Sequence, residues 1–249
     1  MQIDLNNKTA LVIGGGSDIG RAVCLQLARS GASVASDYQD EEQAQHLRET
    51  LAEEGISVRL FTADLMDFNS CATLIAGLEA ELGPVDIIVN TLDFRDPVRF
   101  ADMDKQQWEH ILSGNLDSVF NICRHVVDGM NSRGFGRIIN IASVISRRGE
   151  PGYSHYGAAK MGLHGFTMSL AQELARNGVT VNTVSPGYID NNSLQSLPEE
   201  ERQALIASIP AARLGNAGEI ACLVDFLCSD HAGYITGADI SVNGGQYMH

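Results

Sequence analysis

The 249-residue sequence lacks any long hydrophobic run. No apolar stretch approaches the ~20 residues that a helix needs to cross a bilayer. The N-terminus, MQIDLNNKTALVIGGG, has no basic segment followed by a long apolar stretch, so we expect no signal peptide and a soluble, cytoplasmic protein. Linkers rich in Pro or Ser, low-complexity tracts and internal repeats are missing too, which predicts one domain over residues 1–249.

Basic residues are few. The sequence has 17 Lys and Arg against 31 Asp and Glu, a formal charge of −14. This charge repels polyanions, so nucleic acid is an unsuitable partner and an acidic carrier protein is disfavoured. Local hydrogen-bond donors can still hold a small anionic ligand. No C-x-x-C pair or metal-ligand spacing of His is present, so we expect no metal site. We interpret five cysteines as reduced core residues: Cys24, Cys71, Cys123, Cys222 and Cys228.

Apolar, β-rich runs alternate with segments of helical period. The strand-like runs are TALVIGG, SVASDY, VRLFTAD, VDIIVN, GRIINIAS, VTVNTVSPG and ADISVNGG. Helices are expected over residues 19–29, 41–53, 69–81, 106–133, 156–176 and 219–227. Nearly continuous apolar strands that alternate with helices indicate a parallel sheet covered on both faces. We therefore predict an α/β, Rossmann-like, doubly wound fold of about seven strands.

Residues 188–209 fit neither the strand nor the helix pattern cleanly. The segment follows a strand end, where open α/β sheets bind ligands, so we favour a substrate lid over a solvated surface excursion.

A glycine-rich turn lies between the first strand-like run and the first helix. Glycine lets the backbone approach a pyrophosphate, and a helix N-terminus offers N–H donors and a positive dipole end. We predict a dinucleotide-phosphate site here, the alternative being a tight structural turn. The predicted contacts are Gly14, Gly16, Ser17, Asp18, Ile19 and Gly20.

Asp37 ends the second strand-like run. A carboxylate at this position can accept hydrogen bonds from the adenosine ribose hydroxyls. A 2′-phosphate would instead call for Arg or Lys near Ser17, Asp18 or Tyr38, and none of these positions is basic. The residues therefore favour NAD over NADP.

The motif YGAAK places Tyr156 and Lys160 four residues apart on one helix face, with Ser143 thirteen residues before the tyrosine at a strand end. A phenol ionises near pH 10, so Tyr156 needs a nearby cation to act as acid or base at neutral pH, and Lys160 supplies one. Ser143 would hydrogen-bond a carbonyl oxygen as negative charge develops on it. We interpret His155 and His164 as surface or packing residues.

With these residues in place, the chain from Lys8 to Gly245 resembles the short-chain dehydrogenase/reductase family. The resemblance rests on GGGSDIG, Asn115 in SGNLDSVF, Ser143, the Tyr156–Lys160 pair and Pro186-Gly187. It implies that Asn115 holds a water that relays protons to Lys160, that Lys160 binds the nicotinamide ribose, and that Tyr156 transfers the hydroxyl proton. Further cofactor contacts that it implies are Asp64 (to adenine), Leu65, Asn90, Tyr156, Lys160, Pro186, Gly187 and Ile189.

Three longer phrases are similar to the acetoacetyl-CoA reductases within this family: VVDGMNSRGFGRIINIASV, GLHGFTMSLAQELARNGVTVNTVSPGYI and TGADISVNGG. The likeness implies reduction of a 3-oxoacyl thioester to the 3-hydroxyacyl product, typically with NADPH, and assembly as a homotetramer. Acyl-CoA is the expected substrate, and the acyl-carrier-protein thioester stays open.

Substrate contacts are expected at Ser143, Tyr153, Tyr156 and Tyr188. Four arginines fall on loops expected near the rim of the site, where they would meet nucleotide phosphates or serve as ordinary surface charge: Arg95, Arg99, Arg147 and Arg148.

Three single positions and one four-residue segment depart from the family pattern. Ile13 stands where Thr is usual, Asp18 replaces the middle glycine of the turn, Asn191 replaces the Thr after Pro-Gly, and NTLD (residues 90–93) replaces Asn-Asn-Ala-Gly. Two alternatives stay open. The acidic Asp37 region and the unusual loops allow an NAD-dependent dehydrogenase of another small secondary alcohol or ketone, and the departures allow a family member that no longer catalyses.

Overall fold

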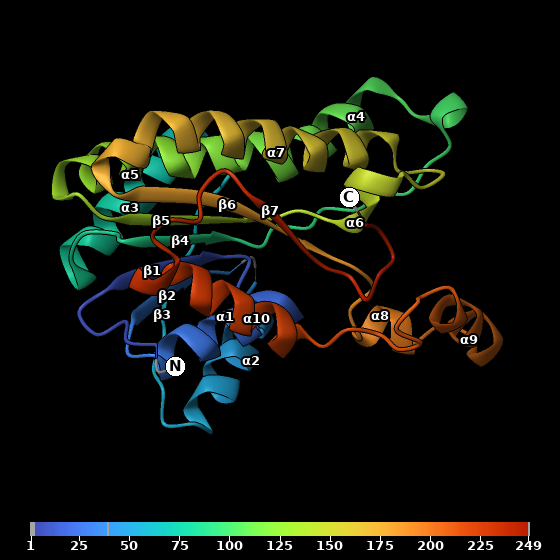
Figure 1. Cartoon of the computed structure of the whole chain (residues 1–249), viewed down its shortest axis with the longest axis horizontal. Coiled ribbons are helices and arrows are strands. Elements are labelled where there is room, and N and C mark those ends of the chain that lie inside the picture. The colour runs from blue at the N-terminus through green and yellow to red at the C-terminus, as the bar shows by residue number, and fades with distance from the viewer. Residues whose placement is uncertain (1–2, 39, 249) are drawn as a thin grey trace.

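The computed structural model describes residues 3–38 and 40–248, and its seven strands form one parallel sheet in the order β3-β2-β1-β4-β5-β6-β7 (Figure 1). This confirms the predicted seven-stranded α/β fold. The order reverses direction between β1 and β4, the switch point at which such sheets bind ligands. The strands are β1 (Thr9–Ile13), β2 (Ser33–Asp37), β3 (Arg59–Phe61), β4 (Ile87–Asn90), β5 (Gly136–Ile141), β6 (Val179–Pro186) and β7 (Asp239–Val242).

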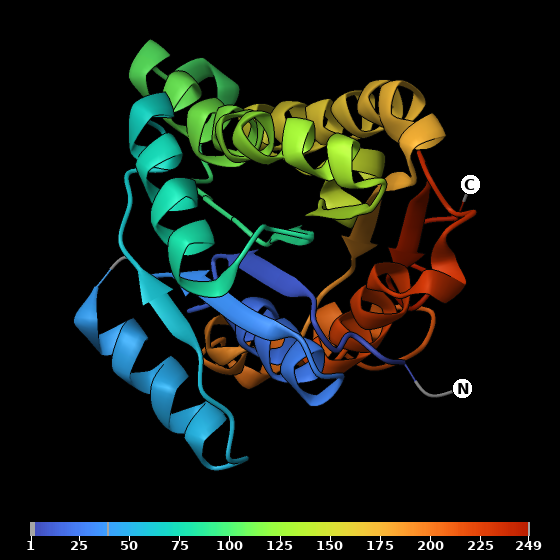
Figure 2. The same ribbon diagram turned by 90° about the vertical axis from the view of Figure 1, so that its left-hand side faces the viewer.

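Two layers of helices enclose the sheet (Figure 2). One face carries α1 (Asp18–Arg29), α2 (Glu41–Ala52) and α10 (Ala217–Cys228), and the other carries α3 (Phe68–Leu82), α5 (Ser118–Arg133) and α7 (Ser154–Leu174) (Figure 1). The remaining α-helices are α4 (Lys105–Leu112), α6 (Val144–Arg148), α8 (Asn192–Gln195) and α9 (Glu199–Ala207). Single 3₁₀ turns cover Phe100–Asp102, Ala175–Asn177 and Asp230–Ala232.

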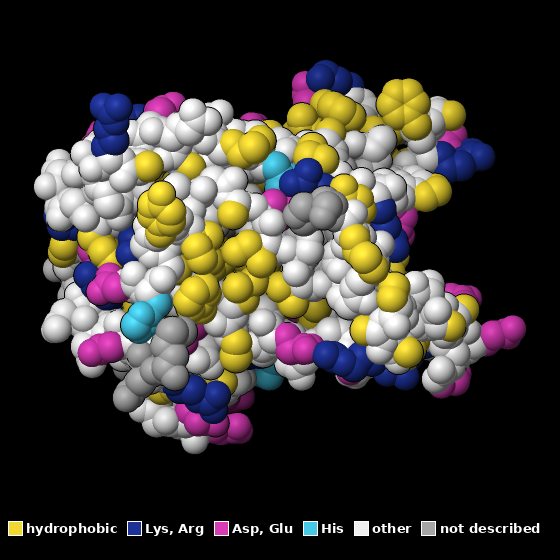
Figure 3. Space-filling view, in the orientation of Figure 1, with side chains coloured by type: hydrophobic (Ala, Val, Ile, Leu, Met, Phe, Trp, Pro, Cys, Tyr) yellow, Lys and Arg dark blue, Asp and Glu magenta, His cyan; other side chains and the backbone are white. Residues whose placement is uncertain are grey.

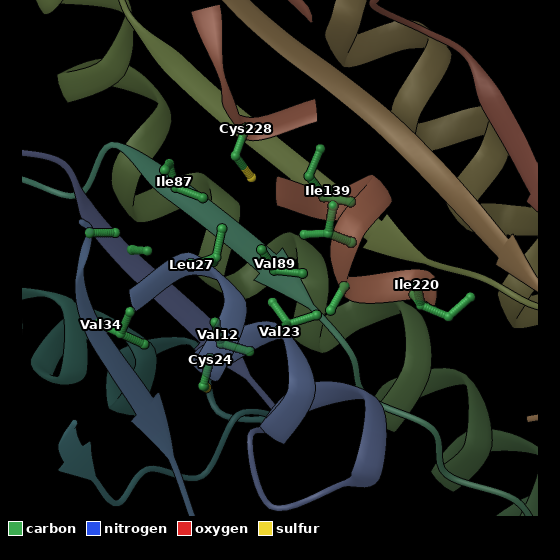
Figure 4. Packing of buried hydrophobic residues seen from close by; sticks show 14 of the residues in the cluster. Val12, Val23, Cys24, Leu27, Val34, Ile87, Val89, Ile139, Ile220 and Cys228 are labelled. Carbon is green, nitrogen blue, oxygen red and sulfur yellow. The ribbon is translucent and has the colours of Figure 1, made fainter. Parts of the chain in front are cut away.

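Successive strand residues enter different cores. Val12, Val89 and Ile139 pack toward α1 and α10, where Figure 4 shows them opposite Val23, Leu27 and Ile220. Their sequence neighbours Leu11, Ile88 and Ile138 pack against α3, α5 and α7. Because both sheet faces are covered, the central strands are apolar throughout rather than alternating.

The register of the central strands brings three loops together. Asn90 of β4 pairs with Ile13 on one side and with Asn140 on the other. The glycine turn after β1, the loop after β4 and the Ser143 segment after β5 therefore start at the same level of the sheet edge.

The predicted helices match the observed ones within about two residues, except between residues 106 and 133. There a π-helical turn, Ser113–Asp117, separates α4 from α5. Such turns widen a helix locally and redirect its side chains. Residues 188–209 contain α8 and α9, which project from the body of the molecule (Figure 1).

The cysteine prediction is confirmed at four positions and wrong at one. Cys222 is exposed, whereas the other four cysteines are buried. On α10, Ile220 and Val224 face the core, and the helical period turns Cys222 away from it. No helix of the described residues is long and apolar enough to cross a membrane.

Helix α10 offers a matched pair of substitutions. Leu227 is fully buried between α10 and the sheet, so Leu227→Ala should lower the free energy of unfolding by about 2–5 kcal/mol, because it removes buried methyl groups and leaves a cavity. The exposed Cys222→Ala should stay within about 0.5 kcal/mol of wild type. Urea unfolding followed by circular dichroism measures both, and equal losses would contradict the packing described here.

Candidate active site

The glycine-rich turn connects β1 to α1 at the switch point of the sheet. Gly14 has a φ of +83°, which favours glycine, and a Cβ added to Gly20 would lie only 2.1 Å from the Gly14 carbonyl oxygen. Ser17 begins the helix, because its hydroxyl accepts a hydrogen bond from Gly20 N at 3.0 Å. The turn thus presents a helix N-terminus and bare backbone to the cleft in front of it.

Two of the departures from the family pattern have a local explanation here. Asp18 is the first residue of α1 and forms an ion pair with Arg21, so its carboxylate is neutralised within the chain, while Ser17 rather than Asp18 caps the helix. Ile13 lacks the hydroxyl that the usual Thr would provide. The Thr91 hydroxyl instead donates a hydrogen bond to Ile13 O at 2.7 Å. This bond ties the loop after β4 to the glycine turn.

A cleft of about 230 Å³ opens in front of the turn. Four sequence-predicted residues line it, namely Gly14, Gly16, Ser17 and Asp37. The sequence did not identify the other residues of the lining, which are Tyr38, Gln43, Thr91, Leu92, Asp93 and Phe94. The last four follow β4 directly, and this position was a usable signal. None of the described residues that line this cleft is Lys or Arg.

Other predicted cofactor residues lie away from this lining. Asn90 is buried in the sheet, where its amide donates to Asn140 Oδ1 at 2.7 Å. Asp64 is exposed and accepts a hydrogen bond from Met66 N at 3.0 Å, and Leu65 beside it is buried. Pro186 is the last residue of β6, and Gly187 and Ile189 follow it, with Gly187 N hydrogen-bonded to Val242 O at 3.0 Å.

Asp37 is buried beneath the glycine turn and is only 3% exposed. Its Oδ1 accepts a hydrogen bond from Gly14 N at 2.6 Å. Burial raises the pKa of Asp37 to about 6, and the Gly14 hydrogen bond opposes this rise. The carboxylate therefore has a fixed orientation at the cleft wall and only partial compensation for its charge.

Tyr156, Lys160 and Ser143 come together at the carboxyl ends of β4 and β5. Tyr156 and Lys160 lie on the first turns of α7 and are buried, and the Lys160 ammonium is 5.8 Å from the centre of the Tyr156 ring. Lys160 Nζ donates to Leu92 O at 2.5 Å and to Ile141 O at 3.0 Å. Burial lowers the pKa of Lys160 to about 8. Ser143 caps α6. Its hydrogen bond with Tyr156 lowers the pKa of Tyr156 and so favours the phenolate.

Asn115 lies in the π-helical turn and is fully buried. Its amide group donates to Phe94 O and Ile111 O, both at 2.9 Å, and its oxygen accepts from Phe94 N at 3.1 Å. Asn115 therefore fixes the backbone of the loop that follows β4.

Asp93 was not predicted as a site residue, although NTLD marked the place. The Tyr156 hydroxyl donates to Asp93 Oδ1 at 2.6 Å, and Arg95 forms an ion pair with Asp93 Oδ2 at 2.8 Å. Burial raises the pKa of Tyr156 and the Asp93 charge raises it further. Although the carboxylate of Asp93 is partly shielded from solvent, which alone would raise its pKa, the charges of Arg95 and Lys160 hold that pKa below its usual range.

The remaining predicted substrate residues surround this centre. The Tyr153 ring meets the Tyr156 ring edge-on, with centroids 5.8 Å apart. The Tyr188 hydroxyl contacts Arg148 and lies 3.2 Å from Glu150 Oε2. All four predicted rim arginines have carboxylate partners, in the pairs Arg95–Asp93, Arg99–Asp102, Arg147–Asp239 and Arg148–Glu150.

Three other residues singled out in the sequence have structural contacts. His155 and His164 are both buried, the first against Asp96 O at 3.0 Å and the second against the Ser146 hydroxyl at 3.1 Å, so both are packing residues. Asn191 caps α8 by accepting a hydrogen bond from Leu194 N at 2.9 Å. Among the described residues, no group of His, Cys, Asp or Glu could hold a metal ion.

Comparison with known proteins identifies the class that this fold and site define. The profile of a family described as "Enoyl-(Acyl carrier protein) reductase" matches residues 14–247. The chain belongs to this family of short-chain dehydrogenases/reductases and is an oxidoreductase, as its sequence predicted.

Individual relatives match over nearly the whole chain. An acetoacetyl-CoA reductase of Allochromatium vinosum is 43% identical over 244 residues, covering 97% of this chain and 99% of the relative. Nodulation protein G of Azospirillum brasilense is 42% identical over 245 residues, covering 97% and 98%. A 3-oxoacyl-[acyl-carrier-protein] reductase of Pseudomonas aeruginosa is 39% identical over 246 residues, covering 99% and 100%.

Asp37 makes stability depend on pH. Its native pKa of about 6 lies above the ordinary 3.8, so the native state binds the proton more tightly than the unfolded chain does. The free energy of unfolding therefore falls as the pH rises from about 4 to about 6, and the full penalty is present at pH 7. Asp37→Asn should raise the free energy of unfolding by up to about 3 kcal/mol at pH 7, and this gain should vanish near pH 4.

Urea unfolding at several pH values tests this expectation. Asp128→Asn is the control, because Asp128 is 81% exposed and its substitution removes no buried charge. A gain for Asp37→Asn that is equal at pH 4 and pH 7 would show that Asp37 is not destabilised by burial of its charge.

Proposed function

We propose that the chain reduces a 3-oxoacyl thioester of the acetoacetyl-CoA type to the 3-hydroxyacyl thioester with a nicotinamide cofactor. The observation that carries the proposal is the meeting of Tyr156, Lys160 and Ser143 beside the cleft of the glycine turn. The relatives named acetoacetyl-CoA reductase, which span nearly the whole chain, support the thioester.

The chain's own residues fit a dinucleotide. The Gly14–Gly20 turn and the N-terminus of α1 would hold the diphosphate. Glycine is needed at Gly14 and Gly16, because a Cβ there would collide with the Thr91 or Gln43 side chain of the same cleft. Asp37 would accept hydrogen bonds from ribose hydroxyls. A bound nicotinamide supplies the hydride that reduces the substrate carbonyl carbon.

Tyr156 acts as the general acid in this proposal. Its hydroxyl gives its proton to the carbonyl oxygen as that oxygen becomes negatively charged, and Ser143 donates a hydrogen bond to the same oxygen. Lys160 has two of its three N–H groups on Leu92 O and Ile141 O, so one remains for the ribose of the nicotinamide. With a pKa of about 8, Lys160 is largely charged at pH 7 and favours the tyrosinate that proton transfer leaves behind.

NADH is the proposed cofactor rather than NADPH. Asp37 lies at the end of β2, and the described residues lining the cleft contribute no cation to bind a 2′-phosphate. Arg21, the nearest basic residue of the turn, is already paired with Asp18 and lies 3.4 Å from Gly16 O.

The substrate enters from the side of the molecule that is hollowed between the α4 region and the α8–α9 segment (Figure 3). We propose that this segment, residues 188–209, is the lid, and that Tyr153 and Tyr188 contact the acyl or pantetheine part. The formal charge of −14 favours a CoA thioester over one on an acidic carrier protein. We also propose a homotetramer that covers the exposed apolar side chains Phe120, Met161 and Met168 of α5 and α7.

Tyr156→Phe removes the transferable proton and leaves the ring packing. It should lower kcat for acetoacetyl-CoA reduction by about 10²–10⁴-fold, measured as the loss of reduced-nicotinamide absorbance. The fully exposed Tyr234→Phe is the matched control and should retain wild-type turnover. If wild type turned over another ketone but not acetoacetyl-CoA, the thioester would be the wrong substrate.

Tyr38→Arg places a cation at the cleft wall next to Asp37. It should raise the ratio of kcat/KM with NADPH to kcat/KM with NADH by at least ~10-fold, because one charge-assisted hydrogen bond to the 2′-phosphate is worth this factor. Tyr38→Gln, which changes size without adding charge, should leave the ratio near wild type. A wild-type preference for NADPH of tenfold or more would contradict the proposed cofactor.

A further inference from the structure

Asp93 places a carboxylate where the family pattern has a glycine, directly at the acid–base tyrosine. One oxygen accepts the Tyr156 hydroxyl at 2.6 Å and the other accepts Arg95 at 2.8 Å. The Arg95 guanidinium also lies 5.4 Å from the centre of the Tyr156 ring. A short hydrogen bond to an ionised acceptor is stronger than one between neutral groups.

The backbone on both sides of Asp93 is fixed by the same residues that form the site. Leu92 O accepts the Lys160 ammonium, and Phe94 exchanges two hydrogen bonds with the Asn115 side chain. The Asp93 side chain is 39% exposed toward the open cleft. Its carboxylate is therefore anchored at its base and accessible at its tip.

This arrangement sets up a competition for one proton. A phenol has a single hydrogen, so a Tyr156 hydroxyl that donates to Asp93 does not donate to a substrate carbonyl at the same time. Several charged or titratable groups surround the Tyr156 ring and its hydroxyl. The Asp93 charge disfavours the phenolate, while Arg95 and the Ser143 hydrogen bond favour it. Lys160 approaches from α7, and Tyr153 packs against the ring.

We propose that Asp93 is a positioning residue that keeps the Tyr156 hydroxyl protonated and occupied until a substrate carbonyl oxygen displaces the carboxylate. The inference rests on the proposed function for the identity of that carbonyl. In the step itself the Tyr156 O–H bond breaks, the new O–H bond forms on the substrate oxygen, and Asp93 takes up no proton. The resulting tyrosinate then faces Asp93 and is reprotonated from solvent through the open cleft.

A titration without substrate tests the first half of the proposal. Phenolate absorbance is followed with increasing pH in wild type and in Asp93→Asn, each measured against the same protein carrying Tyr156→Phe, so that only Tyr156 contributes among the six tyrosines. Circular dichroism limits the range to the folded protein. In Asp93→Asn the Tyr156 phenolate should form about one to three pH units lower than in wild type, or form where wild type shows none. Coincident titrations would overturn the proposal.

Kinetics test the second half. In Asp93→Asn, the alkaline limb of the pH profile of log kcat/KM for reduction should move to lower pH. In Asp93→Gly, KM for acetoacetyl-CoA should fall about 3- to 10-fold, because the substrate no longer displaces a hydrogen bond. Asp102→Asn, which removes the carboxylate of the nearby exposed Arg99 pair, is the control and should match wild type. An unchanged KM together with an unmoved alkaline limb would overturn the proposal.

The two proposals can fail separately. If the Tyr156 titration moves as stated but no thioester is reduced, the proposed substrate fails and the role of Asp93 stands. If thioester reduction is lost in Tyr156→Phe but Asp93→Asn leaves the titration unmoved, the proposed function stands and the role of Asp93 fails. Asp93→Asn keeps the size of the side chain, so the test does not depend on whether Asp93→Gly folds.

Discussion

The buried ammonium of Lys160 is the interaction on which the rest of the site depends. A cation removed from water must be compensated, and here the carbonyl groups of Leu92 and Ile141 compensate it. Leu92 follows β4 and Ile141 is the last residue of β5, so one side chain of α7 joins the carboxyl ends of both strands. Tyr156, one helical turn before Lys160, is thereby held at the same strand ends.

The fold was predictable because its signals are local. Strands buried on both faces give continuous apolar runs, and helices that cover a sheet give a 3.6-residue period. The exceptions arise where contacts between distant residues determine the local conformation or the buried face of a helix. The π-helical turn at Ser113–Asp117 contains the buried Asn115, and the exposure of Cys222 depends on which face of α10 meets the sheet. A short run such as IACLVDFLC is apolar on several faces, so its sequence does not show which face is buried.

The site was predictable only in part. The glycine turn and the Tyr156–Lys160 pair are each encoded within a few residues, and their spacing indicates their chemistry. The Tyr156–Asp93 bond joins residues 63 positions apart, and it exists because the register of β4 and β5 places the two segments side by side. No local pattern carries that register. The same holds for Thr91, whose bond to Ile13 O replaces a hydroxyl that the family pattern would place on β1.

The two carboxylates of the cleft differ in how their charges are compensated, and this difference separates their roles. Asp93 has Arg95 and Lys160 nearby, so its charge is satisfied within the chain and its pKa stays low. Asp37 has no cation among the groups that shift its pKa, and burial raises that pKa to about 6 although the backbone N–H groups of Gly14 and of Asp37 itself oppose the rise. A carboxylate at a cleft wall whose charge is only partly compensated can accept hydrogen bonds from the hydroxyl groups of a ligand. A carboxylate that is already paired within the chain instead changes the ionisation of the groups beside it. The charges thus favour ligand binding at Asp37 and control of Tyr156 at Asp93.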